Sequence, residues 1–97
     1  MTLFDSWQEL IQQDSIDAVF IATPHAQHAQ AALSAAKAGK HLLIEKPMAC
    51  SVAECDAIVD ACKANHVKCT IAFTQRMRIC NKKAKEWVDS GKLGNVK

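Results

Sequence analysis

The sequence has no long apolar run, no concentrated positive charge and no closely spaced pair of cysteines. No stretch approaches the roughly 20 apolar residues that a membrane-spanning helix needs. The first residues, MTLFDSWQEL, have neither a basic leader nor an apolar signal core. The formal net charge is only +2 and the basic residues are scattered, which argues against a nucleic-acid-binding face. We therefore expect a cytoplasmic protein that binds neither membranes nor nucleic acid.

The cysteines and histidines lack the spacing of a metal site. The cysteines are five, an odd number, with no C-x-x-C pair, so we expect reduced thiols. Cys55 and Cys62 are seven residues apart and would share one helix face, where free cysteine commonly packs as a small apolar residue. His25 and His28 could point the same way on a helix, but no third ligand stands nearby. We predict no metal site.

The composition is that of one small globular domain. Apolar residues make up 49% and charged residues 23% of the 97 positions. No internal repeat, linker or low-complexity segment divides the chain, so we predict a single domain over residues 1–97.

Three short apolar runs, at residues 18–22, 41–45 and 67–74, predict β-strands. Helix-forming segments separate them, and this alternation indicates parallel β-α-β units. The runs carry apolar residues on both alternations, which is typical of strands covered on both faces. Right-handed crossovers would place the strands side by side in chain order.

The helices are predicted from capping signals and apolar spacing. Ser6 with Glu9, and Ser51 with Glu54, match the S-x-x-E capping pattern. Gly39 follows the alanine-rich segment 26–38, where a left-handed residue ends a helix. The expected inward-facing residues are Trp7, Leu10 and Ile11 in the first helix, Val52, Cys55, Ile58, Val59 and Cys62 in the third, and Ala84, Trp87 and Val88 in a last helix over 81–90 that Gly91 ends.

The predicted fold class is α/β, a partial Rossmann-type three-layer unit of three parallel strands with about four helices. Its first strand, residues 17–22, would have an open edge. Such an edge is a template for pairing with another chain. Two copies meeting edge to edge would complete a continuous sheet, so dimerisation is a natural completion of the fold.

Polar residues follow each predicted strand. Thr23, Glu45, Lys46 and Arg76 stand at or just beyond the ends of these runs. Ligands of open α/β sheets bind beyond the carboxyl ends of the strands, so these side chains would gather along one rim. The alternative is that they are ordinary solvated charges at exposed strand ends.

Several motifs are similar to those of one enzyme family. They are the D-A-V-x-I-A-T-P strand, the following His28, the A-G-K-H turn and the E-K-P triplet, and later AFTQRMR and AKEWVDSGKLGNVK. In this order and spacing the set resembles the glucose-fructose oxidoreductase/inositol dehydrogenase (Gfo/Idh/MocA) family. The resemblance extends from about Asp5 to the C-terminus.

The resemblance implies an NAD(P)-dependent oxidoreductase of sugars, cyclitols and their derivatives, with NAD or NADP as cofactor. Lys46 would be catalytic, reaching the nicotinamide and a substrate hydroxyl and assisting proton transfer. Arg76 would lie on the substrate side, and Pro47 would follow a cis peptide bond. The cofactor-binding residues implied by the resemblance are Thr23, Pro24, His28, Glu45, Lys46 and Pro47.

Two parts of the family pattern are missing from these 97 residues. The three glycines, Gly39, Gly91 and Gly94, cannot form the G-x-G-x-x-G turn that holds the pyrophosphate. The family's substrate domain, with its catalytic aspartate and histidine, is also missing. Ile79 stands near the place where many members have proline. The chain thus resembles the C-terminal half of a dinucleotide-binding domain.

Three functional hypotheses follow. The first is that the chain is a complete small oxidoreductase. The second is that it is a truncated module, inactive alone and unable to bind the cofactor tightly, which forms a homo-oligomer through the edge strand 17–22. The third is that it is part of a larger active dehydrogenase. Without the phosphate-binding turn we expect weak NAD(P) binding and no activity from this chain alone.

Overall fold

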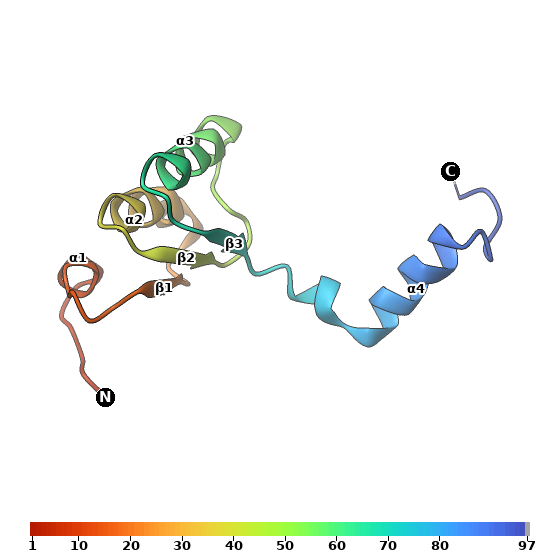
Figure 1. The fold of residues 1–97 in the computed structure, drawn as a ribbon, viewed down its shortest axis with the longest axis horizontal. Helices are drawn as coiled ribbons and strands as arrows, with labels where there is room; N and C mark the ends of the chain where they lie inside the picture. Colours follow the sequence, from red (N-terminus) through yellow and green to blue (C-terminus); the bar gives the residue numbers. More distant parts are fainter. Residues whose placement is uncertain (97) are drawn as a thin grey trace.

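The computed structural model describes residues 1–96 and contains three strands and four α-helices (Figure 1). The elements follow the predicted order along the chain. They are α1 (Trp7–Ile11), β1 (Ala18–Ile21), α2 (His25–Lys37), β2 (His41–Ile44), α3 (Val52–Ala64), β3 (Cys69–Ile71), the 3₁₀ helix η1 (Thr74–Met77) and α4 (Ile79–Asp89).

The strands form one parallel sheet in the order β1-β2-β3. Phe20, Leu43 and Thr70 lie in one row across it. Two β-α-β units with α2 and α3 as the crossovers produce this order, as the alternation of strands and helices predicts. The prediction of an α/β, partial Rossmann-type unit is confirmed.

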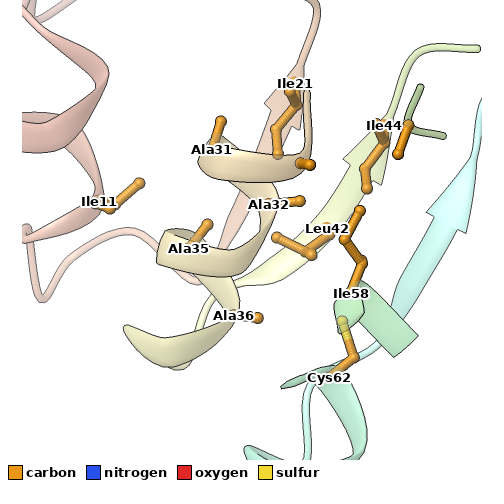
Figure 2. Packing of buried hydrophobic residues seen from close by; sticks show 12 residues of the cluster. Ile11, Ile21, Ala31, Ala32, Ala35, Ala36, Leu42, Ile44, Ile58 and Cys62 are labelled. Carbon is orange, nitrogen blue, oxygen red and sulfur yellow. The ribbon is translucent and has the colours of Figure 1, made fainter. Parts of the chain in front are cut away.

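The core lies on the face of the sheet that α2 and α3 cover (Figure 2). Ile44 on β2 and Ile58 on α3 are fully buried. The side of α2 that faces the core carries alanines, whose small side chains let the helix lie close to the strands. Burial of each isoleucine contributes about 1.5–3 kcal/mol. The buried alanines of α2 are Ala29, Ala31, Ala32, Ala35 and Ala36.

The opposite face of the sheet is exposed. Phe20 and Leu43 point away from the core and are 58% and 38% exposed. The expectation that the strands are covered on both faces is wrong for residues 1–96. The reason is that α2 and α3 lie on the same side of the sheet and α4 extends away from it (Figure 1).

Both predicted serine caps form, but within residues 1–96 only Glu54, and not Glu9, returns a side-chain hydrogen bond. Ser6 Oγ accepts a hydrogen bond from Glu9 N at 3.2 Å and so begins α1. Ser51 Oγ accepts from Glu54 N at 3.2 Å and donates to Glu54 Oε2 at 3.1 Å, which closes the start of α3. Gly39, after α2, has φ of 74°, the left-handed conformation that glycine adopts at low cost.

A buried lysine joins the first helix to the sheet. Lys40, in the turn between α2 and β2, is only 8% exposed. Its Nζ donates a 2.8 Å hydrogen bond to Gln13 O, just beyond α1. Ile11 packs against the alanines of α2 on the same side. These two contacts fix α1 against the rest of the fold.

The predicted apolar stripe of α3 is wider than the observed one. Ile58 and Cys62 are buried and Cys55 is partly buried. Val52 is 78% exposed and Val59 is 39% exposed, so their inward placement is wrong. Val52 is the first residue of α3 and precedes the turns that pack on α2 and the sheet.

The prediction of an inward face on α4 is also wrong. Every residue of α4 is exposed, including Ala84, Trp87 and Val88. The helix extends from η1 away from the sheet (Figure 1), which gives the molecule dimensions of 52 × 33 × 25 Å. Its radius of gyration is 17.0 Å, against about 13 Å for a compact domain of 100 residues. No helix within residues 1–96 has the length and apolar character to cross a bilayer.

Candidate active site

A cavity of about 340 Å³ lies beyond the carboxyl ends of β2 and β3. Lys46 and Arg76 both line it, as do the residues between β3 and η1. Both side chains reach this cavity because β2 and β3 are neighbouring parallel strands and each charged residue lies beyond the end of its strand. The complete lining is Lys46, Ala72, Phe73, Thr74, Gln75 and Arg76.

Backbone contacts fix the position of Lys46. Glu45 N still donates to Ile21 O on β1, at 2.9 Å, although the strand has ended. Glu45 is half-buried, and its Oε2 accepts a 3.1 Å hydrogen bond from Lys46 N. The Lys46–Pro47 peptide bond is cis, as the resemblance implies. Pro47 has no N–H to continue the strand, so Lys46 is exposed at the rim.

Arg76 is held by the 3₁₀ turn and by an aromatic ring. Its backbone N–H donates to Phe73 O at 2.9 Å, and its guanidinium carbon lies 4.9 Å from the centre of the Phe73 ring. A cation over an aromatic face is stabilised by about 0.5–1 kcal/mol at an exposed site. The contact aligns the charged group with the cavity that Lys46 lines.

A second cavity, of about 550 Å³, adjoins Arg76 and is rich in positive charge. Lys82 and Lys85 of α4 line it with Arg76. Lys85 pairs with Asp89 at 2.8 Å, whereas Arg76 and Lys82 form no ion pair within residues 1–96. Sequence reasoning missed these lysines. Their spacing of three residues on a helix was the available signal.

His28 lies beneath the strand ends rather than at the surface. Its side chain is fully buried on α2. Nδ1 is 2.8 Å from Pro47 O, and Nε2 is 2.8 Å from Thr23 O. Both ring nitrogens are therefore engaged by the protein, and the ring joins the end of β1 to the turn after β2.

Thr23 carries a buried polar atom without a partner. Its Oγ1 has no hydrogen bond within residues 1–96, and an unmade hydrogen bond at a buried hydroxyl costs about 1–3 kcal/mol. The next residue, Pro24, precedes the first turn of α2 and makes no side-chain cap. An unpaired hydroxyl beside the strand ends is suited to a polar ligand group.

The predicted residues thus fall into two connected groups. Lys46 and Arg76 share a cavity, whereas Thr23 and Pro47 are joined beneath the rim by His28. Contact of these residues with a cofactor or substrate stays a prediction. No cluster of three or more histidine, cysteine or acidic side chains within residues 1–96 is arranged to hold a metal ion.

Comparison with known proteins places this chain in a family. Residues 1–73 match the family model described as "Oxidoreductase family, NAD-binding Rossmann fold". Oxidoreductase P35 of Formosa agariphila is 44% identical over 89 residues, which are 92% of this chain and 28% of that protein. The levoglucosan dehydrogenase of Pseudarthrobacter phenanthrenivorans is 37% identical over 90 residues, which are 93% of this chain and 23% of that enzyme.

Solved structures show the same fold. The scyllo-inositol dehydrogenase of Lactobacillus casei, with bound NAD(H) and scyllo-inositol, has a TM-score of 0.86 at 32% sequence identity. The likeness covers 95% of this chain and 27% of that one. This chain spans about a quarter of the length of the relatives that it matches. From the family match over most of its residues, the chain belongs to the Gfo/Idh/MocA family of oxidoreductases with an NAD-binding Rossmann fold.

Proposed function

We propose that this chain supplies the nicotinamide side of the active site in a dehydrogenase of sugars or cyclitols that uses NAD or NADP. The observation that carries the proposal is the shared cavity of Lys46 and Arg76 beyond β2 and β3. Lys46 accepts the proton of the substrate hydroxyl at its Nζ, and Arg76 orients the substrate from the other side of the cavity. The cofactor, when bound, accepts the hydride.

The residues present fit one half of such a cofactor. The unpaired hydroxyl of Thr23 and the exposed rim at Lys46 offer polar groups for the nicotinamide and its ribose. The pyrophosphate has no corresponding cradle, because the sequence contains no G-x-G-x-x-G turn. We therefore propose that this chain alone binds NAD(P) weakly and is inactive, and that it works within an oxidoreductase that also provides that turn.

The names of two relatives support sugars or cyclitols as the substrate class. Levoglucosan dehydrogenase and scyllo-inositol dehydrogenase both act on polyhydroxylated rings. Such substrates present hydroxyl groups to a lysine and an arginine at the rim. A reducing compartment such as the cytoplasm suits the five free cysteines of this chain.

A chimaera tests the role of Lys46. The matching segment of the levoglucosan dehydrogenase is replaced by this chain, and oxidation of levoglucosan is followed by the absorbance of the reduced cofactor. Lys46→Met is expected to lower kcat at least about 100-fold, the usual size of a lost general acid–base group. The matched control is Lys63→Met, because that side chain is 75% exposed on α3 and remote from the cavity. An active Lys46→Met chimaera would refute the catalytic role.

Cofactor titration tests the weakness of binding. Purified chain is mixed with NADH or NADPH, and cofactor fluorescence is followed to millimolar concentration. We expect no saturation. Saturable binding at micromolar cofactor would show that these residues hold the cofactor without the glycine-rich turn, and would favour a complete small oxidoreductase.

The edge of β1 favours a second candidate, a homo-oligomerising module. β1 pairs only with β2 within residues 1–96, so its outer edge is open. Phe20 adds exposed apolar surface beside that edge. We propose that two copies pair through residues 17–22 across a two-fold axis. Light scattering that shows a monomer at high protein concentration would contradict this proposal.

A further inference from the structure

Positive charge collects where η1 meets α4. Residues 75–85 contain five basic residues and no acidic one, although the whole chain carries a net charge of only +2. Three of these basic residues line the cavity of about 550 Å³, together with two uncharged amides and no carboxylate. Such a lining is suited to an anion, because nothing within the cavity balances its cations. The complete lining is Gln75, Arg76, Asn81, Lys82 and Lys85.

Two of the three cations have no charged partner. Arg76 and Lys82 form no ion pair within residues 1–96, and the first turn of α4 contains no acidic residue. Lys85 pairs with Asp89, but both side chains are more than half exposed. An exposed ion pair contributes little to stability, so a more highly charged anion can displace Asp89.

Short-range contacts hold the two sides of the cavity together. Asn81 Nδ2 donates a 2.7 Å hydrogen bond to Gln75 O, which ties the first turn of α4 to η1. Arg78 Nη1 donates to Gln75 Oε1 at 3.3 Å across the same junction. The Phe73 ring supports the guanidinium of Arg76. Each contact joins residues that are close in the sequence, so the cavity is built within one local unit of the chain.

We propose that this cavity binds the phosphate group of a phosphorylated sugar or cyclitol. A phosphate monoester carries about 1.5 to 2 negative charges at pH 7 and offers three acceptor oxygens, which suit three cations better than the single charge of a carboxylate does. A guanidinium can bind two phosphate oxygens at once, and ammonium groups bind them as point charges. Arg76 also lines the cavity of Lys46, so a phosphate held here would direct the sugar ring toward Lys46. The substrate class rests on the proposed function, whereas phosphate binding is a property of this chain.

Titration of the ¹⁵N-labelled chain with glucose 6-phosphate tests the site, at an ionic strength held constant with sodium chloride. The backbone amide of Asn81 and the side-chain Nε–H of Arg76 are expected to shift and to reach saturation. Glucose has the same ring without the charge and should leave both signals in place. Glucuronate carries a single charge and should bind more weakly than glucose 6-phosphate. The absence of saturable shifts, or binding of glucuronate that is as tight as that of glucose 6-phosphate, would overturn the proposal.

Two substitutions with the same change in net charge separate a site from a diffuse positive potential. Lys82→Gln removes a cation of the lining, whereas Lys83→Gln removes its neighbour, which lies outside the lining and pairs with Glu86 at 2.8 Å. Both lysines are exposed, so neither change should unfold the chain. The dissociation constant of glucose 6-phosphate is expected to rise about tenfold in Lys82→Gln, the usual effect of losing a hydrogen bond to a charged group, and less than about twofold in Lys83→Gln. Equal rises would overturn the proposal, because general attraction would then explain the binding.

The outcomes also separate this inference from the proposed function. Phosphate binding that depends on Lys82, found together with an inactive levoglucosan dehydrogenase chimaera, would support the phosphate site and count against the proposed function alone. An active chimaera, found together with no saturable binding of glucose 6-phosphate by this chain, would overturn the phosphate site and leave the proposed function standing.

Discussion

Ser51 and Glu54 close the start of α3 through reciprocal contacts. The hydroxyl oxygen accepts from Glu54 N, and Glu54 Oε2 also accepts from Cys50 N at 3.0 Å. Ser51→Ala is expected to lower the free energy of unfolding by about 1 kcal/mol, measured by urea denaturation. Ser15→Ala is the control, because that residue is exposed in a turn and should change stability by less than about 0.5 kcal/mol. If Ser51→Ala and Ser15→Ala lower the free energy of unfolding equally, the Ser51 cap does not stabilise the fold.

The buried thiols predict a reactivity order among the cysteines. Burial, together with the neighbouring Cys62 thiol, raises the pKa of Cys69 from 9.0 to about 11. Burial also raises the pKa of Cys62. At about pH 8, the Cys69 thiolate is then roughly 100-fold scarcer than that of an ordinary thiol. Alkylation followed by mass spectrometry should modify the exposed Cys50 and Cys80 first. Early labelling of Cys69 would contradict the order.

The same pKa shift sets a pH dependence of stability. Between pH 9 and pH 11 the unfolded chain loses the Cys69 proton while the folded chain keeps it. Folded protein then binds more protons than unfolded protein, so stability falls as pH rises through this window. The contribution is fully present below pH 9. Cys69→Ser should flatten the decline in urea-unfolding experiments, and an unchanged slope would assign it to other groups.

At the scale of elements, β1 has two different edges. Asp17 O accepts a hydrogen bond from His41 N, and Ile21 O accepts one from Glu45 N, both at 2.9 Å. In β1, the backbone N–H and C=O groups of alternate residues therefore point toward β2. Ala18 and Phe20 therefore direct their backbone N–H groups to the open edge. Ala18→Pro removes one of these groups, at the first residue of an edge strand where proline is tolerated. We expect it to shift a dimer toward monomer in sedimentation experiments.

A proline one residue later provides the matched comparison. Val19 directs its N–H to β2, so Val19→Pro should unfold the chain rather than change its oligomeric state. If Ala18→Pro leaves a dimer intact, the two copies do not meet through β1.

The order and type of the elements could be predicted because their signals are local. S-x-x-E pairs, a glycine after an alanine-rich run and prolines after strands each act within a few residues. Which apolar residues become buried depends on what lies opposite them. Val52, Trp87 and Val88 have helical spacing, but no element of residues 1–96 covers them. The helical spacing of apolar residues therefore predicted more buried residues than the structure has.

The candidate site was predictable to a similar extent. The strand ends and the family motifs together predicted that Lys46 and Arg76 lie along one rim of the sheet. In the structure both residues line one cavity. The burial of His28 could not be read from its position, since only the folded turn after β2 brings Pro47 O to the ring. Lys82 and Lys85 were missed for a related reason: their place beside Arg76 depends on the direction in which η1 sends α4.

At the scale of the whole molecule, the chain divides into a packed unit and a projecting helix. No residue of α4 is buried, so truncation after Arg78 is expected to change the free energy of unfolding by less than about 0.5 kcal/mol. Deletion of residues 1–11 removes the buried Ile11 and should cost about 2–5 kcal/mol. Urea unfolding measures both. A large loss on removing α4 would mean that the helix packs on the sheet in solution.

The buried amine of Lys40 has a consequence for proteolysis. Trypsin must draw a lysine side chain into its specificity pocket, and Lys40 is held inside the fold by Gln13 O. The lysines of α4 are exposed, and no other element of residues 1–96 covers that helix. Brief digestion should therefore trim the chain from its carboxyl end and spare the bond after Lys40. A peptide ending at Lys40 would appear only when the sheet itself has opened, which makes that cleavage a simple reporter of global unfolding.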